Sequence, residues 1–324
     1  MIYNYINPTK ERLKTMFQAR VLSIQDISCL GKCSLTVALP IISAMGVETC
    51  IIPTAVLSTH TGGFTGYTWR DLTEDIPKIA GHWSDLDIKF NAIGTGYLGS
   101  FEQIGMVKDI FDRFGDGCIK FVDPVMGENG RLYTGFTPEF ASEMARLCAK
   151  ADVIVPNMTE ASYMLGIDYA AGPYDEEYVK DVLVRLSDLG CPVAAITGVV
   201  LKSSPDKQGV IAYNGKTEEF FSYFSENLPV KFHGTGDIYS SAMCGALALG
   251  KSLDYAVRIA VDYTVECIRR SIGDDEHKYG VRFEECIPYL PDYLRKCPYP
   301  PRLRRGVLHF DLKNGEILDI CLFL

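Results

Sequence analysis

Short apolar runs alternate with longer amphipathic segments along most of the chain, and this alternation limits the possible fold more than any other feature. Runs of strand character cover residues 20–25, 48–53, 88–93, 119–122, 153–155 and 193–197. Helical periodicity fills the intervals, at 34–45 and most clearly at 102–114, 138–150 and 176–189. This order predicts an α/β protein with three α/β/α layers, in which helices cover both faces of a doubly wound, mostly parallel sheet.

The later part of the chain changes pattern. Residues 209–213 and 216–224 have strand character, and Asn214-Gly215 between them is a strong hairpin signal, so we predict an antiparallel hairpin at one edge of the sheet. Helices over 237–249 and 253–271 should follow. We expect one domain over residues 19–290, with extensions at 1–18 and 291–324. In the second extension, Asn314-Gly315 between short apolar runs leaves open a small hairpin or a loosely attached tail.

Composition and charge exclude several classes of function. The chain is 47% hydrophobic and 23% charged, as soluble globular proteins are, and its net charge of −9 argues against a nucleic-acid partner. The longest apolar stretch, 35–47, is too short to span a bilayer, and no secretion signal is evident, so we expect a cytoplasmic protein. The 11 cysteines lie mainly among apolar residues, as buried thiols do, and Cys29 and Cys33 lack a second pair for zinc.

The sequence Gly234-Thr235-Gly236-Asp237, followed by a run of small residues, carries the strongest functional signal. It predicts a glycine turn in front of a buried helix, where unpartnered amides and the helix dipole attract an anion. Asp237 beside them is placed to accept a proton from a hydroxyl, which fits phosphoryl transfer. A glycine-rich turn with Asp237 as a dipole-compensating residue explains the pattern equally well. The helix N-terminus should also lower the pKa of Asp237 and make it a weak base.

Further polar residues follow the predicted strands, where ligands of such sheets bind. Asp123 ends a buried strand and is either a ligand for magnesium or phosphate or a turn residue. Asn157 and Glu160 have the spacing of a capping box, which favours that role over Glu160 facing a magnesium-bound water. The loop 128–133 either folds over a nucleotide or is a surface loop.

Two loops have the composition of a small-molecule pocket. Ser58, His60 and Thr61 lie among hydroxyls and glycines that can hydrogen-bond a small polar ring or satisfy one another. Tyr97 lies between Gly96 and Gly99, which would let a flat ligand approach its ring.

Together these segments resemble the ribokinase-like superfamily and, within it, the pyridoxal/pyridoxamine kinases of vitamin B6 salvage. The resemblance runs from about residue 20 to residue 290 and rests on five ordered motifs. The motifs are Ser58 to Thr61, Thr95 to Ser100, Asp123 to Gly127, Asn157 with Glu160, and Gly234 to Asp237.

The resemblance implies a homodimeric kinase that uses ATP and Mg²⁺ to phosphorylate the 5′-hydroxymethyl group of a small pyridine, with a monovalent cation such as K⁺ as a further cofactor candidate. It assigns residues to three groups by position. The catalytic group is Asp237 as base and the amides of Gly234, Thr235 and Gly236 as anion hole. The nucleotide group is Asp123, Tyr133, Asn157, Glu160, Thr197, Gly234 and Gly236, with Asp123 and Glu160 as metal ligands. The substrate group is Ser58, His60, Thr61, Tyr97 and Asp237.

One position departs from the resemblance. Pyridoxal kinases commonly carry Ser or Thr after the Gln of the first strand, whereas Asp26 follows Gln25 here. One hypothesis is that Asp26 binds an amino-bearing ligand and favours pyridoxamine or an aminopyrimidine, since a charge-assisted contact of ~1.5–3 kcal/mol gives about tenfold discrimination. The alternative is that Asp26 caps the loop before Cys29 and touches no ligand.

Three other functions share some of these features. Hydroxymethylpyrimidine kinase of thiamine synthesis shares the fold and the Gly-Thr-Gly-Asp turn, so it stays open as an alternative with a pyrimidine substrate. A nicotinamide-dependent oxidoreductase would need G-x-G-x-x-G after the first strand, and residues 25–31 do not supply it. A non-catalytic vitamer-binding protein is opposed by the presence of both Asp237 and Glu160.

Overall fold

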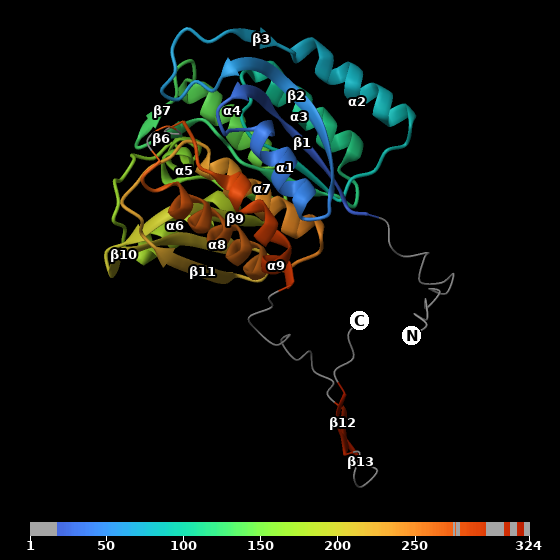
Figure 1. Ribbon diagram of the computed structural model, residues 1–324, viewed down its shortest axis with the longest axis vertical. Coiled ribbons are helices and arrows are strands. Elements are labelled where there is room, and N and C mark those ends of the chain that lie inside the picture. Colours follow the sequence, from blue (N-terminus) through green and yellow to red (C-terminus); the bar gives the residue numbers. More distant parts are fainter. Residues whose placement is uncertain (1–17, 275, 277–278, 296–307, 312–315, 321–324) are drawn as a thin grey trace.

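A computed structural model describes residues 18–274, 276 and 279–295, together with the backbone of 308–311 and 316–320. A nine-stranded sheet in the order β11-β10-β9-β8-β5-β4-β1-β2-β3 forms its centre (Figure 1). The six middle strands run parallel; they are β9 (Val193–Leu201), β8 (Val153–Ile154), β5 (Ile119–Val122), β4 (Ala92–Thr95), β1 (Arg20–Leu30) and β2 (Glu48–Thr59). The predicted doubly wound, mostly parallel sheet is therefore confirmed.

Antiparallel strands complete both edges of the sheet. The predicted hairpin is formed by β10 (Ser204–Asn214) and β11 (Glu219–Glu226). Because Asn214 pairs with Glu219, the connection is residues 215–218 and not a two-residue Asn-Gly turn. At the other edge, β3 (Trp69–Asp71) pairs with β2. All three residues of β3 are exposed, so it has no apolar alternation from which it could have been predicted.

Helices cover both faces of the sheet, each over its own hydrophobic core (Figure 1). One face carries α1 (Leu35–Ala44), α7 (Thr235–Ala248), α8 (Leu253–Ser271) and α9 (Leu290–Arg295), with the short turns η3 (Phe283–Glu285) and η4 (Ile287–Tyr289). The other face carries η2 (Thr73–Asp75), α2 (Ile76–Asp85), α3 (Phe101–Phe114), α4 (Pro138–Cys148), α5 (Met158–Leu165) and α6 (Glu176–Asp188). The predicted helices at 102–114, 138–150, 176–189 and 253–271 are confirmed to within two residues at each end.

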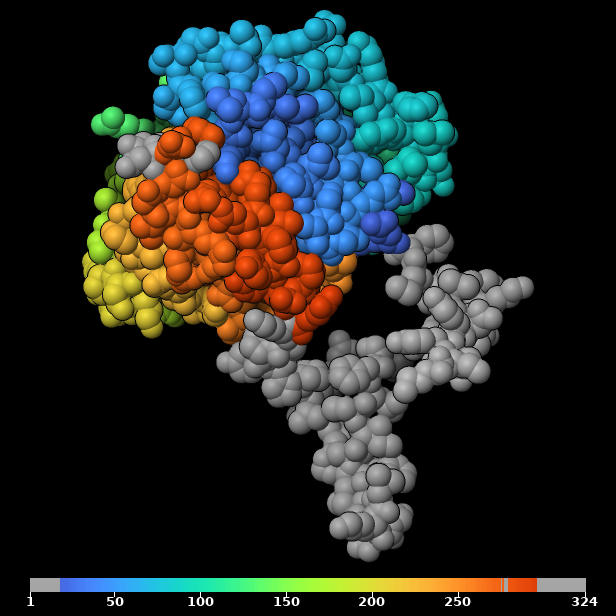
Figure 2. Space-filling model, viewed as in Figure 1, coloured from blue at the N-terminus to red at the C-terminus, as the bar shows by residue number. Residues whose placement is uncertain are grey.

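The last helices return to the first one. In Figure 2 the orange C-terminal helices lie beside the blue segment that contains α1, and α9 and η4 both contact α1. Beyond them, β12 (Leu308–Asp311) and β13 (Glu316–Ile320) pair antiparallel as a separate sheet. Asn314-Gly315 and residues 1–17 lie outside the described residues, and the domain bounds stay predictions. No helix in the described ranges combines the length and apolar character needed to cross a bilayer.

Candidate active site

The N-terminus of α7 opens at the Gly234 turn. Gly234 has φ of 78°, in the left-handed region, and a Cβ on it would lie 1.8 Å from the carbonyl oxygen of Lys32. Only glycine fits this turn. The first amides of a helix have no intrahelical partner, and in the described structure no side chain caps those of α7. A Cβ on Gly236 would meet nothing within 4 Å, which leaves open space beside those amides. The hydroxyl of Thr235 turns back to the Phe232 carbonyl oxygen at 3.4 Å.

Asp237 lies in the first turn of α7 and faces the loop between β1 and α1. The main-chain amide of Ser34 and the thiol of Cys33 lie near its carboxylate, and both lower its pKa. Burial nevertheless raises the pKa of Asp237 to about 7, and repulsion from Asp123 adds to that rise. The expectation that Asp237 is a weak base was therefore wrong, because burial and repulsion from Asp123 outweigh the lowering by the Ser34 amide and the Cys33 thiol. A carboxyl with this pKa can accept a proton at neutral pH.

Two more carboxyls lie behind Asp237. Asp123, directly after β5, accepts a hydrogen bond from Ser240 one turn along α7, and burial raises its pKa to about 7. Glu160 at the start of α5 is only 3% exposed, and burial together with repulsion from Asp123 raises its pKa well above the ordinary value. A cation bound between these two buried carboxyls would relieve their mutual repulsion.

Their oxygen chemistry suits Mg²⁺, which commonly binds one or two carboxylates plus phosphates and water. No group of three or more metal-binding side chains lies within the described part of the chain. Asp123 and Glu160 therefore fit a metal that a nucleotide phosphate helps to hold, and do not form an all-protein cage.

Asn157 and Glu160 form the capping box that their spacing favours. Asn157 Oδ1 accepts the Glu160 amide at 3.0 Å, and Glu160 Oε2 accepts the Asn157 amide at 2.8 Å. Glu160 Oε1 also accepts the amide of Met126 at 3.2 Å, so it joins α5 to the loop after β5. Thr197 bridges to Asn157 between neighbouring strands, which brings these two predicted nucleotide residues together.

The segment predicted as a loop over 128–133 is instead a small hairpin of β6 (Gly127–Glu128) and β7 (Arg131–Leu132). We call residues 127–133 the flap. Asn129 and Gly130 have φ of 53° and 77°, the left-handed pair that a two-residue hairpin turn needs. The flap is tied to α5, because the Gly130 amide donates to Thr159 Oγ1 at 2.9 Å. Tyr133 is 41% exposed, and partial burial and the negative charges of Glu160, Glu128, Asp123 and Asp237 raise the pKa of its phenol, so it lies within reach of these charges.

On the predicted substrate side, His60 uses both ring nitrogens within the protein. Its Nδ1 accepts the Gly62 amide at 3.2 Å, so Nε2 carries the proton and donates to the Tyr279 carbonyl oxygen at 2.8 Å. Burial lowers the pKa of His60. The ring of His60 lies 5.2 Å from that of His233, directly before the Gly234 turn. Its role in a substrate pocket stays a prediction.

The remaining predicted substrate residues differ in exposure. Tyr97 packs edge-on against Trp69 with ring centroids 6.2 Å apart, and burial, with a smaller effect of Asp26, raises its pKa to about 12. Ser58 lies within β2 and its hydroxyl accepts the Thr68 amide at 2.9 Å. Thr61 is exposed. Tyr97 and His60 both interact electrostatically with Asp26, whereas Ser58 is used to hold the chain that leads to β3.

Asp26 lies in β1 at a bulge, where the pairing with β2 shifts between Gln25 and Ile27. It is 5% exposed, and its two oxygens accept hydrogen bonds from the hydroxyls of Ser34 and Ser28. Burial raises the pKa of Asp26, although both hydrogen bonds lower it. Ligand contact by Asp26 stays a hypothesis, and the observed contacts are those of a residue that organises the loop.

Sequence reasoning missed three contact residues, Cys33, Ser34 and Ser240. Ser34 has the residue type of an N-cap before a helix, and Ser240 follows Asp237 by three positions on one helical face, but neither signal names its partner. Cys33 was considered only as a metal ligand. The contact between the 31–34 loop and α7 joins segments some two hundred positions apart, which no local pattern reports.

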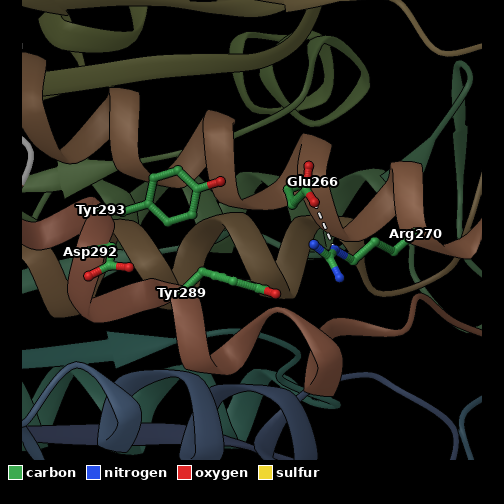
Figure 3. Close-up of a pocket in the computed structure, with 5 residues that line it drawn as sticks. All are labelled: Glu266, Arg270, Tyr289, Asp292 and Tyr293. Atoms are coloured by element: carbon green, nitrogen blue, oxygen red, sulfur yellow. Dashed lines mark hydrogen bonds and ion pairs between the residues drawn. The ribbon is translucent and has the colours of Figure 1, made fainter.

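The described part of the chain has one small hollow at this site and a larger one elsewhere. One of about 10 Å³, the size of a single water, lies beneath α7 among Ser23, Gln25, Thr95 and Ser240. The other, of about 230 Å³, lies between α8 and α9 (Figure 3). Its lining residues are Glu266, Arg270, Tyr289, Asp292 and Tyr293. None of the predicted site residues lines the larger hollow, so we place the candidate site at the α7 N-terminus.

Comparison with known proteins identifies the family to which the chain belongs. The model of the phosphomethylpyrimidine kinase family matches residues 38–281. The hydroxymethylpyrimidine/phosphomethylpyrimidine kinase of Mycobacterium leprae (strain TN) is 28% identical over 77% of this chain and 88% of its own. The pyridoxal kinase of Arabidopsis thaliana is 26% identical over 79% of this chain and 83% of its own.

A solved structure is more similar still. A Bacteroides thetaiotaomicron protein, provisionally assigned as a phosphomethylpyrimidine kinase and crystallised with pyridoxal, is 38% identical with a TM-score of 0.80. The match covers 89% of this chain and 98% of that one. The ribokinase-like fold expected from the motifs is thereby confirmed. The chain therefore belongs to the phosphomethylpyrimidine kinase family and is a kinase of the group that also contains the pyridoxal kinases.

Proposed function

We propose that this kinase transfers the γ-phosphoryl group of ATP to the 5′-hydroxymethyl group of a vitamin B6 vitamer. The observation that carries the proposal is the Asp237 carboxyl, whose pKa of about 7 suits a base, directly beside the open amides of α7. The similarity to a protein crystallised with pyridoxal supports a pyridine substrate.

In the proposed reaction the substrate hydroxyl attacks the γ-phosphorus in line, and the bond to the β–γ bridging oxygen breaks to release ADP. Asp237 takes the hydroxyl proton. The amides at Gly234, Thr235 and Gly236 stabilise the charge that spreads over the equatorial oxygens. Mg²⁺ held by Asp123 and Glu160 would neutralise phosphate charge, and dependence on K⁺ stays a prediction.

On the nucleotide side, Asn157, Thr197 and Tyr133 are proposed to surround the phosphates from the start of α5, from β9 and from the flap. The neighbouring positions of Asn157 and Thr197, and the closeness of Tyr133 to the carboxyls, support this assignment. On the substrate side, Tyr97 and the loop after β2 are proposed to hold the ring.

Phosphorylation of hydroxymethylpyrimidine is the second candidate, because the Mycobacterium leprae relative carries that activity in its name and the matching family model is named for phosphomethylpyrimidine kinase. Parallel measurement of ATP turnover with pyridoxal, pyridoxamine, pyridoxine and hydroxymethylpyrimidine separates the two. We expect the highest kcat/KM with a B6 vitamer. A clear preference for the pyrimidine would replace the proposal with its alternative.

Asp237→Ala tests the mechanism itself. Loss of the general base should lower kcat roughly 10²–10⁴-fold, while ATP binding, measured by calorimetry, persists. Near-normal turnover in this variant would reject Asp237 as the base.

A further inference from the structure

Ser34 links Asp26 to Asp237. Its hydroxyl donates a hydrogen bond to Oδ1 of Asp26. The preceding residue, Cys33, lies against Gly234 at the N-terminus of α7, with its Sγ 3.4 Å from where a Gly234 Cβ would be, and the Ser34 main-chain amide is near enough to Asp237 to lower its pKa. Ser34 is the N-cap of α1, yet its side chain does not cap that helix. An N-cap serine ordinarily accepts an amide of its own helix, so here the hydroxyl has been diverted to Asp26.

The backbone of Ser34 is held in a conformation that serine rarely adopts. Its φ of 54° and ψ of −133° belong to a region that glycine populates freely. Such strain persists where the surroundings impose it, and it concentrates at functional sites. The surroundings here are the Asp26 carboxylate and a backbone bridge between Ile27 and Ser34. The bulge in β1 sets the direction of the Asp26 side chain.

We propose that Asp26 is a positioning residue, which holds the Ser34 amide against Asp237 by way of the Ser34 hydroxyl. This inference rests on the proposed function, in which Asp237 is the base. Asp26 is suited to the task because it is 5% exposed and its second oxygen is fixed by Ser28 Oγ at 2.9 Å. Loss of such a positioning residue should lower kcat for every substrate. Loss of a residue that binds the substrate's amino group should instead raise KM for pyridoxamine.

The first experiment compares two serines that donate to the same carboxylate. Ser34→Ala should lower kcat about tenfold, the loss expected when one hydrogen bond to a charged group is removed. Ser28→Ala removes a bond of the same type but has no contact with Asp237, so it should lower kcat by no more than about twofold. Ser34→Gly should retain more activity than Ser34→Ala, since glycine adopts φ of 54° without strain. Equal losses in the Ser28 and Ser34 variants would overturn the proposal.

The second experiment asks whether Ser34, through which Asp26 is proposed to act, works through Asp237. In a background of Asp237→Ala, adding Ser34→Ala should lower kcat no further than about twofold, because the two changes remove parts of one unit. Losses that multiply in the double variant would overturn the link. The proposed function fails separately, if Asp237→Ala alone keeps near-normal kcat.

The third experiment distinguishes hydrogen bonding from charge. Asp26→Asn keeps an acceptor for Ser34 and should retain more kcat than Asp26→Ala. In both variants, KM for pyridoxal and KM for pyridoxamine should stay as they are in the unaltered protein. If both variants instead raise KM for pyridoxamine alone, Asp26 reads the amino group and the positioning role is rejected. Thermal unfolding of each variant checks that the chain is folded, and the comparison of Asp26→Asn with Asp26→Ala stands even if both lose some stability.

Discussion

Asp237 is the residue on which burial, charge and hydrogen bonding compete most directly. Burial and repulsion from Asp123 raise its pKa, while the Ser34 amide and the Cys33 thiol lower it, and the outcome is a pKa of about 7. An exposed aspartate would be a much weaker base at neutral pH. The same environment that makes Asp237 useful therefore also makes its activity depend on pH.

We predict that kcat/KM falls about tenfold per pH unit below the pKa of Asp237, which lies at about 7, because only the ionised carboxyl can take a proton. In Asp123→Asn the repelling charge is gone, so the pKa of Asp237 falls and the acid limb moves to lower pH. Profiles measured with pyridoxine and with pyridoxamine control for ionisation of the substrate. A limb that stays in place in Asp123→Asn would contradict the electrostatic coupling of the two residues.

Gly234 and Gly236 offer a matched pair for the turn. We predict that Gly234→Ala lowers stability by about 2 kcal/mol or more, from a left-handed φ and a clash with the Lys32 carbonyl oxygen. Gly236→Ala should leave thermal stability unchanged or raise it by about 0.5–1 kcal/mol, because its Cβ has open space within a helix. Similar unfolding temperatures in both variants would show that the turn is not constrained as described.

At the scale of elements, the apolar pattern of the sequence predicts a helix or strand well where the same kind of burial continues along its whole length. The span of α8 (Leu253–Ser271) and that of β5 (Ile119–Val122) were both predictable, the first from a long amphipathic repeat and the second from a short apolar run. β1 was predicted to end at Gln25, and its continuation through a bulge to Leu30 depends on pairing with β2, which is a tertiary effect. The flap was missed as a hairpin because its strands have only two residues each.

The flap is expected to act on nucleotide binding more than on stability. Thr159→Val removes the hydroxyl that accepts the Gly130 amide at 2.9 Å, which should loosen the flap and raise KM for ATP about threefold to tenfold. Tyr163→Phe removes a longer contact to the Gly130 carbonyl oxygen, 3.4 Å, and should have a smaller effect. Steady-state kinetics with varied ATP measure both variants. Unchanged KM for ATP in Thr159→Val would separate the flap from the nucleotide site.

For the whole molecule, the motifs predicted which loops meet but not how their side chains pair. Gly234 to Asp237, Asp123 and Glu160 were identified because glycine turns and strand-end carboxyls have recognisable local patterns. The proximity of Ser34 and Cys33 to Asp237 depends on how α1 packs against α7 on one face of the sheet, so it required the structure. The fold brings the carboxyls of Asp237, Asp123 and Glu160 together where they are shielded from water, and this lowers the stability of the folded state.

This loss of stability can be measured through pH. A carboxyl with a folded pKa of about 7, such as Asp123, binds its proton more tightly in the folded than in the unfolded state. The folded state therefore loses stability as pH rises from about 4 to about 7, by about 1–3 kcal/mol for one such group after allowance for coupling. We predict that Asp123→Asn, with magnesium chelated, raises the unfolding temperature by a few degrees at pH 8 and changes it little at pH 5, where Asp123 is already protonated. Asp109→Asn, an exposed control on α3, should change neither unfolding temperature.

Adding Mg²⁺ and ADP should then stabilise the unaltered protein more than Asp123→Asn, because bound cation relieves the repulsion only where the carboxylate is present. If the Asp123→Asn variant is less stable than the unaltered protein at pH 8, the Asp123 carboxylate stabilises the fold, and its burial does not lower stability.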